Sequence, residues 1–332
     1  MLTLWHQLLS AVGLLGGALL PLAAVHALPV LLESRGWLAL VRLLQPPRAP
    51  SARYLWRAAL IREAIASCLP LSGVGIFAVA LRLLALRGVP AANAVAGLTA
   101  ESTLMLLTQT SFVLVTMGAR LCATSLGPDL RAAGTGLATL SVLLVAAVLV
   151  LHRYSPIPSL LERLLRRVGG LHQVHFKLGA LDAVYRGLDR IYAHRQVCLV
   201  VALWQLAALA ARAGELWLML NFLHVPQPLL LALSLSTVAR LTRSAAAALP
   251  AGLGLQELAF GGLLLGFGFD FTAGVAISIA TRARDLLFGI PALLGWLQLE
   301  RSQNPRSTRG SSVGRSSPMA QASDTNAAPP ER

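Results

Sequence analysis

Apolar segments of bilayer-crossing length run through most of the chain and leave it few possible folds. Judged against a span of about 20 residues, such segments lie near residues 8–32, 54–86, 90–118, 130–151, 197–223, 228–249, 252–268 and 271–297. Inside a bilayer the backbone is satisfied only in helices or closed barrels. Because the alternating pattern of barrel strands does not occur here, we predict an all-α polytopic membrane protein with about eight transmembrane or re-entrant helical segments.

The composition supports a membrane setting. Apolar residues make up 56% of the chain and charged residues 13%, against about 25% charged residues in soluble domains. The formal net charge of +14 comes from arginines that flank apolar segments, where membrane topology and anionic headgroups favour them. Nucleic acid is therefore not an expected partner. Three cysteines, Cys68, Cys122 and Cys198, are isolated in apolar runs and are interpreted as core residues.

Charge and composition also divide the chain. Residues 300–332 are rich in Ser, Pro and Arg and too poor in apolar residues to order themselves, which predicts a transmembrane domain over 1–299 and a disordered tail. Basic residues dominate the loop 152–196, so the positive-inside rule places it in the cytoplasm. Leucines at helical spacing near 160–168 predict an amphipathic helix there. We expect a multi-pass protein of the bacterial inner membrane with a cytoplasmic C-terminal tail.

Helix breakers recur at one offset. Pro70, followed by Gly73 and Gly75, and Pro250, followed by Gly252 and Gly254, lie 180 positions apart. The same offset relates Gly88 to Gly268. We predict a duplication, with repeat one over about 8–118 and repeat two over about 197–298. An odd number of crossings between them would invert one repeat, and inverted repeats with broken helices indicate a midplane transport site. The alternative is two unrelated kinks.

Ionisable residues occur within the second-half segments, although each costs about 2.5–3.5 kcal/mol in hydrocarbon on insertion scales. Arg212 and Glu215 share a helix face and are placed to form a pair within their helix. Arg282 and Asp285 have the same spacing, and Arg284 is expected to point to the opposite side. The residues predicted to line a polar path are Arg240, Arg243, Glu257, Arg282 and Asp285, with Arg212 and Glu215 as flanking partners.

The ionisable residues inside the apolar segments of the second half have a net positive charge. Arginines exceed carboxylates by two there when Arg284 is included. Guanidinium groups suit bidentate phosphate binding, so an anionic lipid headgroup is the expected ligand. The alternative is that Arg282 and Arg284 snorkel to the interface. No metal site, cofactor motif or ATP-binding motif is predicted, because neither ligand spacing nor a phosphate-binding loop occurs.

Residues 243–296 resemble the signature region of a flippase-like membrane family that includes the transmembrane half of lysylphosphatidylglycerol synthases, and within it the hopanoid-biosynthesis-associated branch. The resemblance rests on three runs, Arg243-Ser244-Ala245-Ala246, Gly252-Leu253-Gly254-Leu255-Gln256-Glu257 and Arg282-Ala283-Arg284-Asp285-Leu286-Leu287. It extends more weakly to Ile61-Arg62-Glu63 and Leu69-Pro70. Phe77 and Ser236-Thr237 depart from the pattern, which often has an acidic residue and a Glu-Ser pair at these places.

The resemblance implies the lipid-handling half of such proteins without an aminoacyl-transferring half. We expect a lipid translocase, not an enzyme, that binds an anionic phospholipid or a hopanoid-linked lipid between two inverted halves. Lipid-biosynthesis enzymes are possible partners. The alternatives are an intramembrane lipid-modifying or glycosyltransferase-like enzyme, with Glu257 as general base, and a scaffold for hopanoid biosynthesis.

Overall fold

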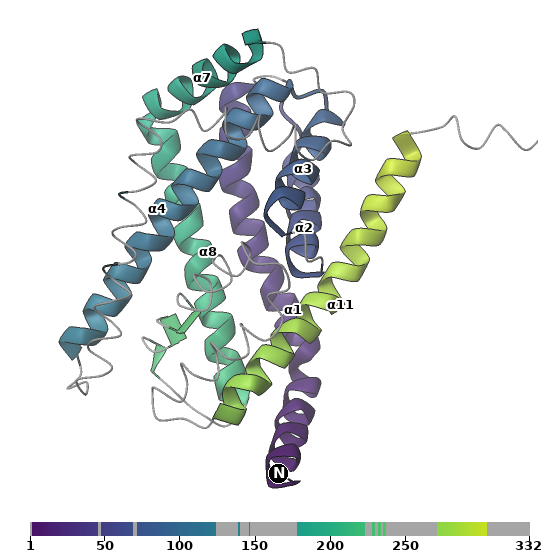
Figure 1. Cartoon of the computed structure of the whole chain (residues 1–332), viewed down its shortest axis with the longest axis vertical. Coiled ribbons are helices and arrows are strands. Elements are labelled where there is room, and N and C mark those ends of the chain that lie inside the picture. Colours follow the sequence, from purple (N-terminus) through teal and green to yellow (C-terminus); the bar gives the residue numbers. More distant parts are fainter. Residues whose placement is uncertain are drawn as a thin grey trace, which may run out of the picture. The chain divides into compact units, whose positions relative to one another are not determined.

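The computed structural model describes residues 2–45, 48–68, 72–123, 178–222 and 271–303, with a few positions between them. Every element in these described residues is an α-helix, as Figure 1 shows. The predicted all-helical fold is confirmed for this part of the chain, whereas eight segments and inverted repeats stay predictions. The helices are α1 (Leu2–Leu44), α2 (Ala52–Cys68), α3 (Ser72–Ala85), α4 (Ala91–Ala123), α7 (Leu178–Ala193), α8 (Arg195–Phe222) and α11 (Phe271–Gln303).

The chain divides into two compact units, Met1–Leu293 and Leu294–Arg332. The first contains α1 to α8 and most of α11, and the second begins with the end of α11. The helix arrangement described below belongs to the first unit. Most of the predicted tail lies outside the described residues.

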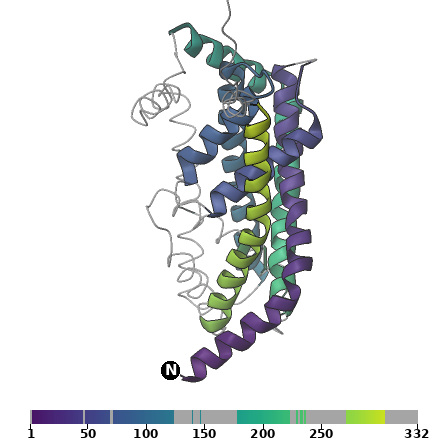
Figure 2. The ribbon, with the colours of Figure 1, turned by 90° about the vertical axis from the view of Figure 1, so that its right-hand side faces the viewer.

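Helices α1 and α8 form an antiparallel pair, and Figure 2 shows them side by side. Gly36 of α1 faces the N-terminal half of α8, where an added β-carbon would lie 3.5 Å from Val201 Cγ1. This glycine allows the two backbones to approach closely. Further along the pair, His26 of α1 lies against Glu215 of α8. The pairing of α1 with α8 therefore brings polar residues that are far apart in the sequence close together in space.

The connection from α2 to α4 follows the predicted breakers. Helix α2 ends at Cys68 and α3 begins at Ser72, so the interval between them contains Pro70, which lies outside the described residues. Helix α3 ends at Ala85, and the turn after it contains Gly88, whose φ of 72° is the left-handed conformation that glycine adopts at helix C-termini. There Val89 N–H donates to the Leu84 carbonyl over 3.2 Å. This turn directs the chain into α4.

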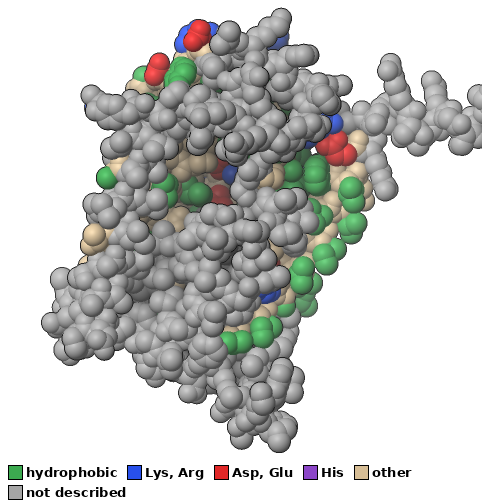
Figure 3. Space-filling model, in the orientation of Figure 1, with side chains coloured by type: hydrophobic (Ala, Val, Ile, Leu, Met, Phe, Trp, Pro, Cys, Tyr) green, Lys and Arg blue, Asp and Glu red, His purple; other side chains and the backbone are tan. Residues whose placement is uncertain are grey.

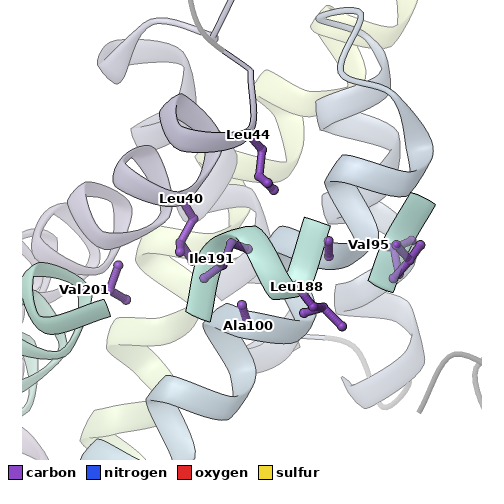
Figure 4. Close-up of a cluster of buried hydrophobic side chains, with 9 residues drawn as sticks. Leu40, Leu44, Val95, Ala100, Leu188, Ile191 and Val201 are labelled. Atoms are coloured by element: carbon purple, nitrogen blue, oxygen red, sulfur yellow. The ribbon is translucent and has the colours of Figure 1, made fainter. Parts of the chain in front are cut away.

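Helix α7 lies across one end of α1, α4 and α8 (Figure 1). Its apolar face joins a buried cluster that links these four helices, shown in Figure 4 and composed of Leu40, Leu44, Val95, Ala96, Ala100, Val184, Leu188, Ile191 and Val201. Its charged residues Asp182, Arg186 and Asp189 are exposed. Helix α7 is thus amphipathic and lies within the predicted cytoplasmic loop, while the segment 160–168 lies outside the described residues.

Two helices in the described part of the chain are long and apolar enough to cross a bilayer, over Ala91–Thr116 and Arg195–Phe222. Helix α8 turns Glu215 and Gln205 inward. On its outer side Leu199, Leu203 and Leu206 are exposed at helical spacing. A helix with apolar residues outside and polar residues inside is typical of a membrane setting. The charged residues within the apolar run of α8, Arg212 and Glu215, therefore face protein.

Candidate functional site

The central feature of the first unit is a set of hydrogen-bonded charged side chains from four helices. We call it the ionic network, and its members are His26 and Glu33 of α1, Glu63 of α2, Arg212 and Glu215 of α8, and Arg284 and Asp285 of α11. In Figure 3, acidic and basic atoms are visible within a recess of the face shown, bordered by hydrophobic and other side chains. The side chains of the network are between 1% and 20% exposed, so they are largely surrounded by protein.

Arg212 joins three helices. Its Nε donates to Glu33 Oε1 over 3.3 Å, and its Nη2 donates to the same oxygen over 3.1 Å. Its Nη1 donates to Glu63 Oε1 over 3.2 Å. The Arg212 side chain is 12% exposed and each carboxylate about a fifth. One guanidinium group therefore holds α1 and α2 against α8 with charge-assisted hydrogen bonds.

His26 occupies the deepest position of the network and is 1% exposed. Its Nδ1 lies 3.1 Å from Glu215 Oε2, and its Nε2 lies 3.6 Å from Glu63 Oε1. The ring of Phe288 meets the imidazole edge to face, with ring centroids 5.5 Å apart. The imidazole is thus enclosed by two carboxylates and an aromatic ring, each from a different helix.

Helix α11 enters the network through Arg284, which is 4% exposed. Its Nη1 donates to Glu215 Oε1, and its Nε donates to Asp285 Oδ1 over 3.1 Å. Glu215 therefore accepts from Arg284 on one oxygen and contacts His26 with the other. This carboxylate is the point where α1, α8 and α11 meet.

A second ion pair lies beside the network. Arg62, next to Glu63 on α2, donates through Nη1 to both carboxylate oxygens of Glu101 on α4, over 3.0 and 3.1 Å. The Arg62 guanidinium carbon lies 4.6 Å from the centroid of the Trp37 ring, which is within cation–π range. Glu101 is buried, so α4 is tied to α2 by a pair largely shielded from solvent.

The predicted site residues have different outcomes. Arg212, Glu215 and Asp285 are brought together in the network, while Arg282 lies half-buried on α11. Gly73 and Gly75 lie at the start of α3. The others lie outside the described residues, namely Arg240, Arg243, Glu257, Pro70, Pro250, Gly252 and Gly254.

One pairing expected from spacing is replaced by contacts between helices. The ion pairs of Arg212 are with Glu33 and Glu63 instead of Glu215, because those carboxylates converge on the guanidinium from α1 and α2. On α11 the hydrogen bonds of Asp285 described here come from Arg284. Arg284 was expected to point away from that residue, yet its long side chain reaches both Asp285 and Glu215.

The sequence interpretation missed the first-half members of the network. His26, Glu33 and Glu63 are not among the residues predicted to line the polar path. Their signal was an ionisable side chain inside an apolar stretch, the criterion that identified Arg212. With them included, carboxylates exceed guanidinium groups by two within the network. The two-arginine surplus counted for the second half alone therefore does not describe this cluster.

Comparison with known proteins agrees with this setting. The family model of the lysylphosphatidylglycerol synthase transmembrane region matches residues 1–293. No curated protein and no solved structure matches the chain. The match covers α1 to α8 and most of α11, and so includes every member of the ionic network. The chain is therefore a helical membrane protein that belongs to the lysylphosphatidylglycerol synthase transmembrane-region family.

Proposed function

We propose that this protein is a lipid translocase of the bacterial inner membrane, not an enzyme, and that the ionic network belongs to its headgroup site. The observation that carries this proposal is the convergence of seven ionisable side chains, each buried or half-buried, between helices of a membrane protein. Ionisable groups at membrane depth are costly and typically mark substrate or ion pathways. A polar interior of this kind gives a headgroup a route through the hydrocarbon layer.

Stability alone is a weak reason for such a network. Buried ion pairs are often no better for stability than apolar residues of similar size. A chain selected only for a stable bundle would therefore gain little from keeping four carboxylates in its centre. Interactions that are exchanged during a transport cycle account better for their presence.

The origin of the network residues supports a site between two halves. Glu33 and Glu63 come from the proposed first repeat, and Arg212 and Arg284 from the proposed second. In an inverted-repeat transporter the substrate site lies at such a repeat interface, near the membrane midplane. Rocking of one half against the other would then expose the site to each side in turn. In this arrangement the tail after residue 299 faces the cytoplasm.

The proposed cargo is an anionic phospholipid or a hopanoid-linked lipid. The arginines predicted for the path, Arg240, Arg243 and Arg282, are the proposed phosphate ligands, because guanidinium groups bind phosphate oxygens in a bidentate manner. Assignment to the hopanoid-associated branch rests on the resemblance of residues 243–296. Lipid-biosynthesis enzymes are the proposed partners in the membrane.

Flipping by purified protein tests the proposal. Wild-type protein in vesicles of phosphatidylcholine and phosphatidylglycerol, with fluorescent phosphatidylglycerol as probe, should expose inner-leaflet probe to an impermeant quencher. Glu215→Gln should slow this exposure at least about tenfold, which corresponds to about 1.4 kcal/mol in the barrier. Glu257→Gln is examined in parallel, and Asp189→Asn, an exposed acid of α7, is the matched control. Monodispersity of each variant on gel filtration separates lost transport from lost folding.

The same vesicles distinguish the rival functions. Covalently altered probe in mass spectra would favour a lipid-modifying enzyme. Unaltered probe that crosses no faster than in protein-free vesicles would refute translocation of this lipid, and a hopanoid-linked probe then takes its place. Failure with both probes would leave the scaffold as the better explanation.

A further inference from the structure

The imidazole of His26 lies between two carboxylates that belong to different helices. Glu215 of α8 contacts its Nδ1 at 3.1 Å, and Glu63 of α2 approaches its Nε2 to 3.6 Å. The side chains of His26 and Glu215 are 1% and 3% exposed. Phe288 covers the imidazole ring edge to face. His26 and Glu215 therefore have little access to water, whereas Glu63 is 19% exposed.

Proton counting shows what this geometry requires. A neutral imidazole has one N–H donor and one nitrogen lone pair. If both carboxylates were ionised, one would face an N–H and the other would face a lone pair, which repels it. The arrangement is satisfied when one further proton is present, either as an imidazolium ion that donates to both carboxylates or on one carboxyl group. His26, Glu63 and Glu215 therefore form a site whose favourable state includes an added proton.

The surrounding charges of the described residues bear on that proton. Those that face the triad are Glu33 from α1 itself, Arg212 from α8, and Arg284 and Asp285 from α11. Within the network carboxylates outnumber guanidinium groups, and nearby negative charge favours the protonated form of an ionisable group.

We propose that His26, with Glu63 and Glu215, is a proton-binding site that couples lipid movement to a proton gradient. The coupling rests on the proposed translocase function, whereas proton binding does not. On loading, a proton passes from water to the triad and the bridge between α1, α2 and α8 is complete. On release, the 3.6 Å contact with Glu63 is the first to be lost, because it is the longer of the two.

When His26 releases its proton, Glu63 still has Arg212 as an ion-pair partner. Glu63 is also an acceptor for Arg212 Nη1 at 3.2 Å, so it keeps a cation when the imidazole loses its proton. Glu63 then keeps its ion pair with Arg212 of α8 and loses its contact with His26 of α1. Release of the proton therefore changes which helices the Glu63 carboxylate joins.

Proton binding is measured on the protein itself. Protein labelled with ¹⁵N-histidine, in lipid nanodiscs, is titrated from about pH 5 to about pH 8, the range in which imidazoles change charge. One imidazole signal, missing from His26→Gln, should show both nitrogens protonated at the acidic end and lose one proton as the pH rises. His194→Gln, which alters an exposed histidine, is the matched control. If the signal assigned to His26 is a neutral tautomer throughout and Glu63→Gln leaves it unchanged, the proton site is refuted.

Coupling is measured in proteoliposomes with the fluorescent phosphatidylglycerol probe. A gradient of one pH unit is worth about 1.4 kcal/mol per proton. One-proton coupling should therefore shift the steady-state ratio of probe between leaflets by up to about tenfold, in a direction that reverses with the gradient. Each variant is compared with its own ratio without a gradient, so differences in basal rate do not enter. In His26→Gln and Glu63→Gln the shift should disappear.

The two measurements separate the two claims. Wild-type protein that moves the probe equally with and without a gradient refutes coupling and leaves the translocase proposal intact. Wild-type protein that binds the proton but moves no probe refutes translocation of this lipid, while the proton site stands. If His26→Gln does not fold, the wild-type gradient dependence and the Glu63→Gln variant decide the question.

Discussion

Replacing Arg212 by methionine tests whether the ionic network depends on its central cation. The guanidinium donates to carboxylates of Glu33 and Glu63, and it is 12% exposed while each carboxylate is about a fifth exposed. Removing one partner of a buried pair costs about 3–5 kcal/mol, because a charge is left without compensation. Partial exposure of both carboxylates places the expected loss near the lower end, at about 3 kcal/mol. That is a large part of the roughly 5–15 kcal/mol that stabilises a folded protein.

The measurement is unfolding of the purified protein in mixed micelles, followed by circular dichroism as denaturing detergent is added. A triple variant, Arg212→Met with Glu33→Gln and Glu63→Gln, provides the internal comparison. Because it removes the two carboxylate charges together with the guanidinium that they face, it should recover most of the stability lost in the single variant. A single variant within about 0.5 kcal/mol of wild type, or a triple variant no more stable than the single one, would refute the reasoning.

Three further predictions concern packing and exposure. Gly187→Ala should destabilise the protein by about 1–3 kcal/mol, as overpacking does, because the added β-carbon would lie 2.8 Å from a side chain of α4; Gly214→Ala, which meets nothing within 4 Å, should not lower the unfolding midpoint. Tyr54→Phe should cost about 0.5–1.5 kcal/mol by removing a buried 2.6 Å hydrogen bond to a carbonyl of α3, measured in the same titration. Cysteine at exposed Leu203 should resist a membrane-impermeant maleimide in inverted membrane vesicles, whereas cysteine at exposed Asp189 should react; equal labelling of both would contradict the lipid-facing assignment of α8.

Much of the fold follows from the sequence alone. Apolar segments predict α1, α4, α8 and α11, because hydrocarbon leaves the backbone no partner except itself. Pro70 predicts the interval between α2 and α3, since proline lacks the N–H that continues a helix. Arg212 and Glu215 were identified as site residues because a charge inside an apolar helix has few structural explanations. Each of these inferences depends only on the residues of one segment and on the lipid or water around it.

The partners of those charges were decided by the tertiary structure. Spacing along a helix reports only neighbours one turn away, and it favoured a pair between Arg212 and Glu215. The contacts that form instead join Arg212 to Glu33 and Glu63, which are 179 and 149 residues away along the chain. Their meeting depends on how closely α1 approaches α8 at Gly36 and on the register that follows. Relative helix positions of this kind come from packing of whole surfaces, which no local pattern encodes.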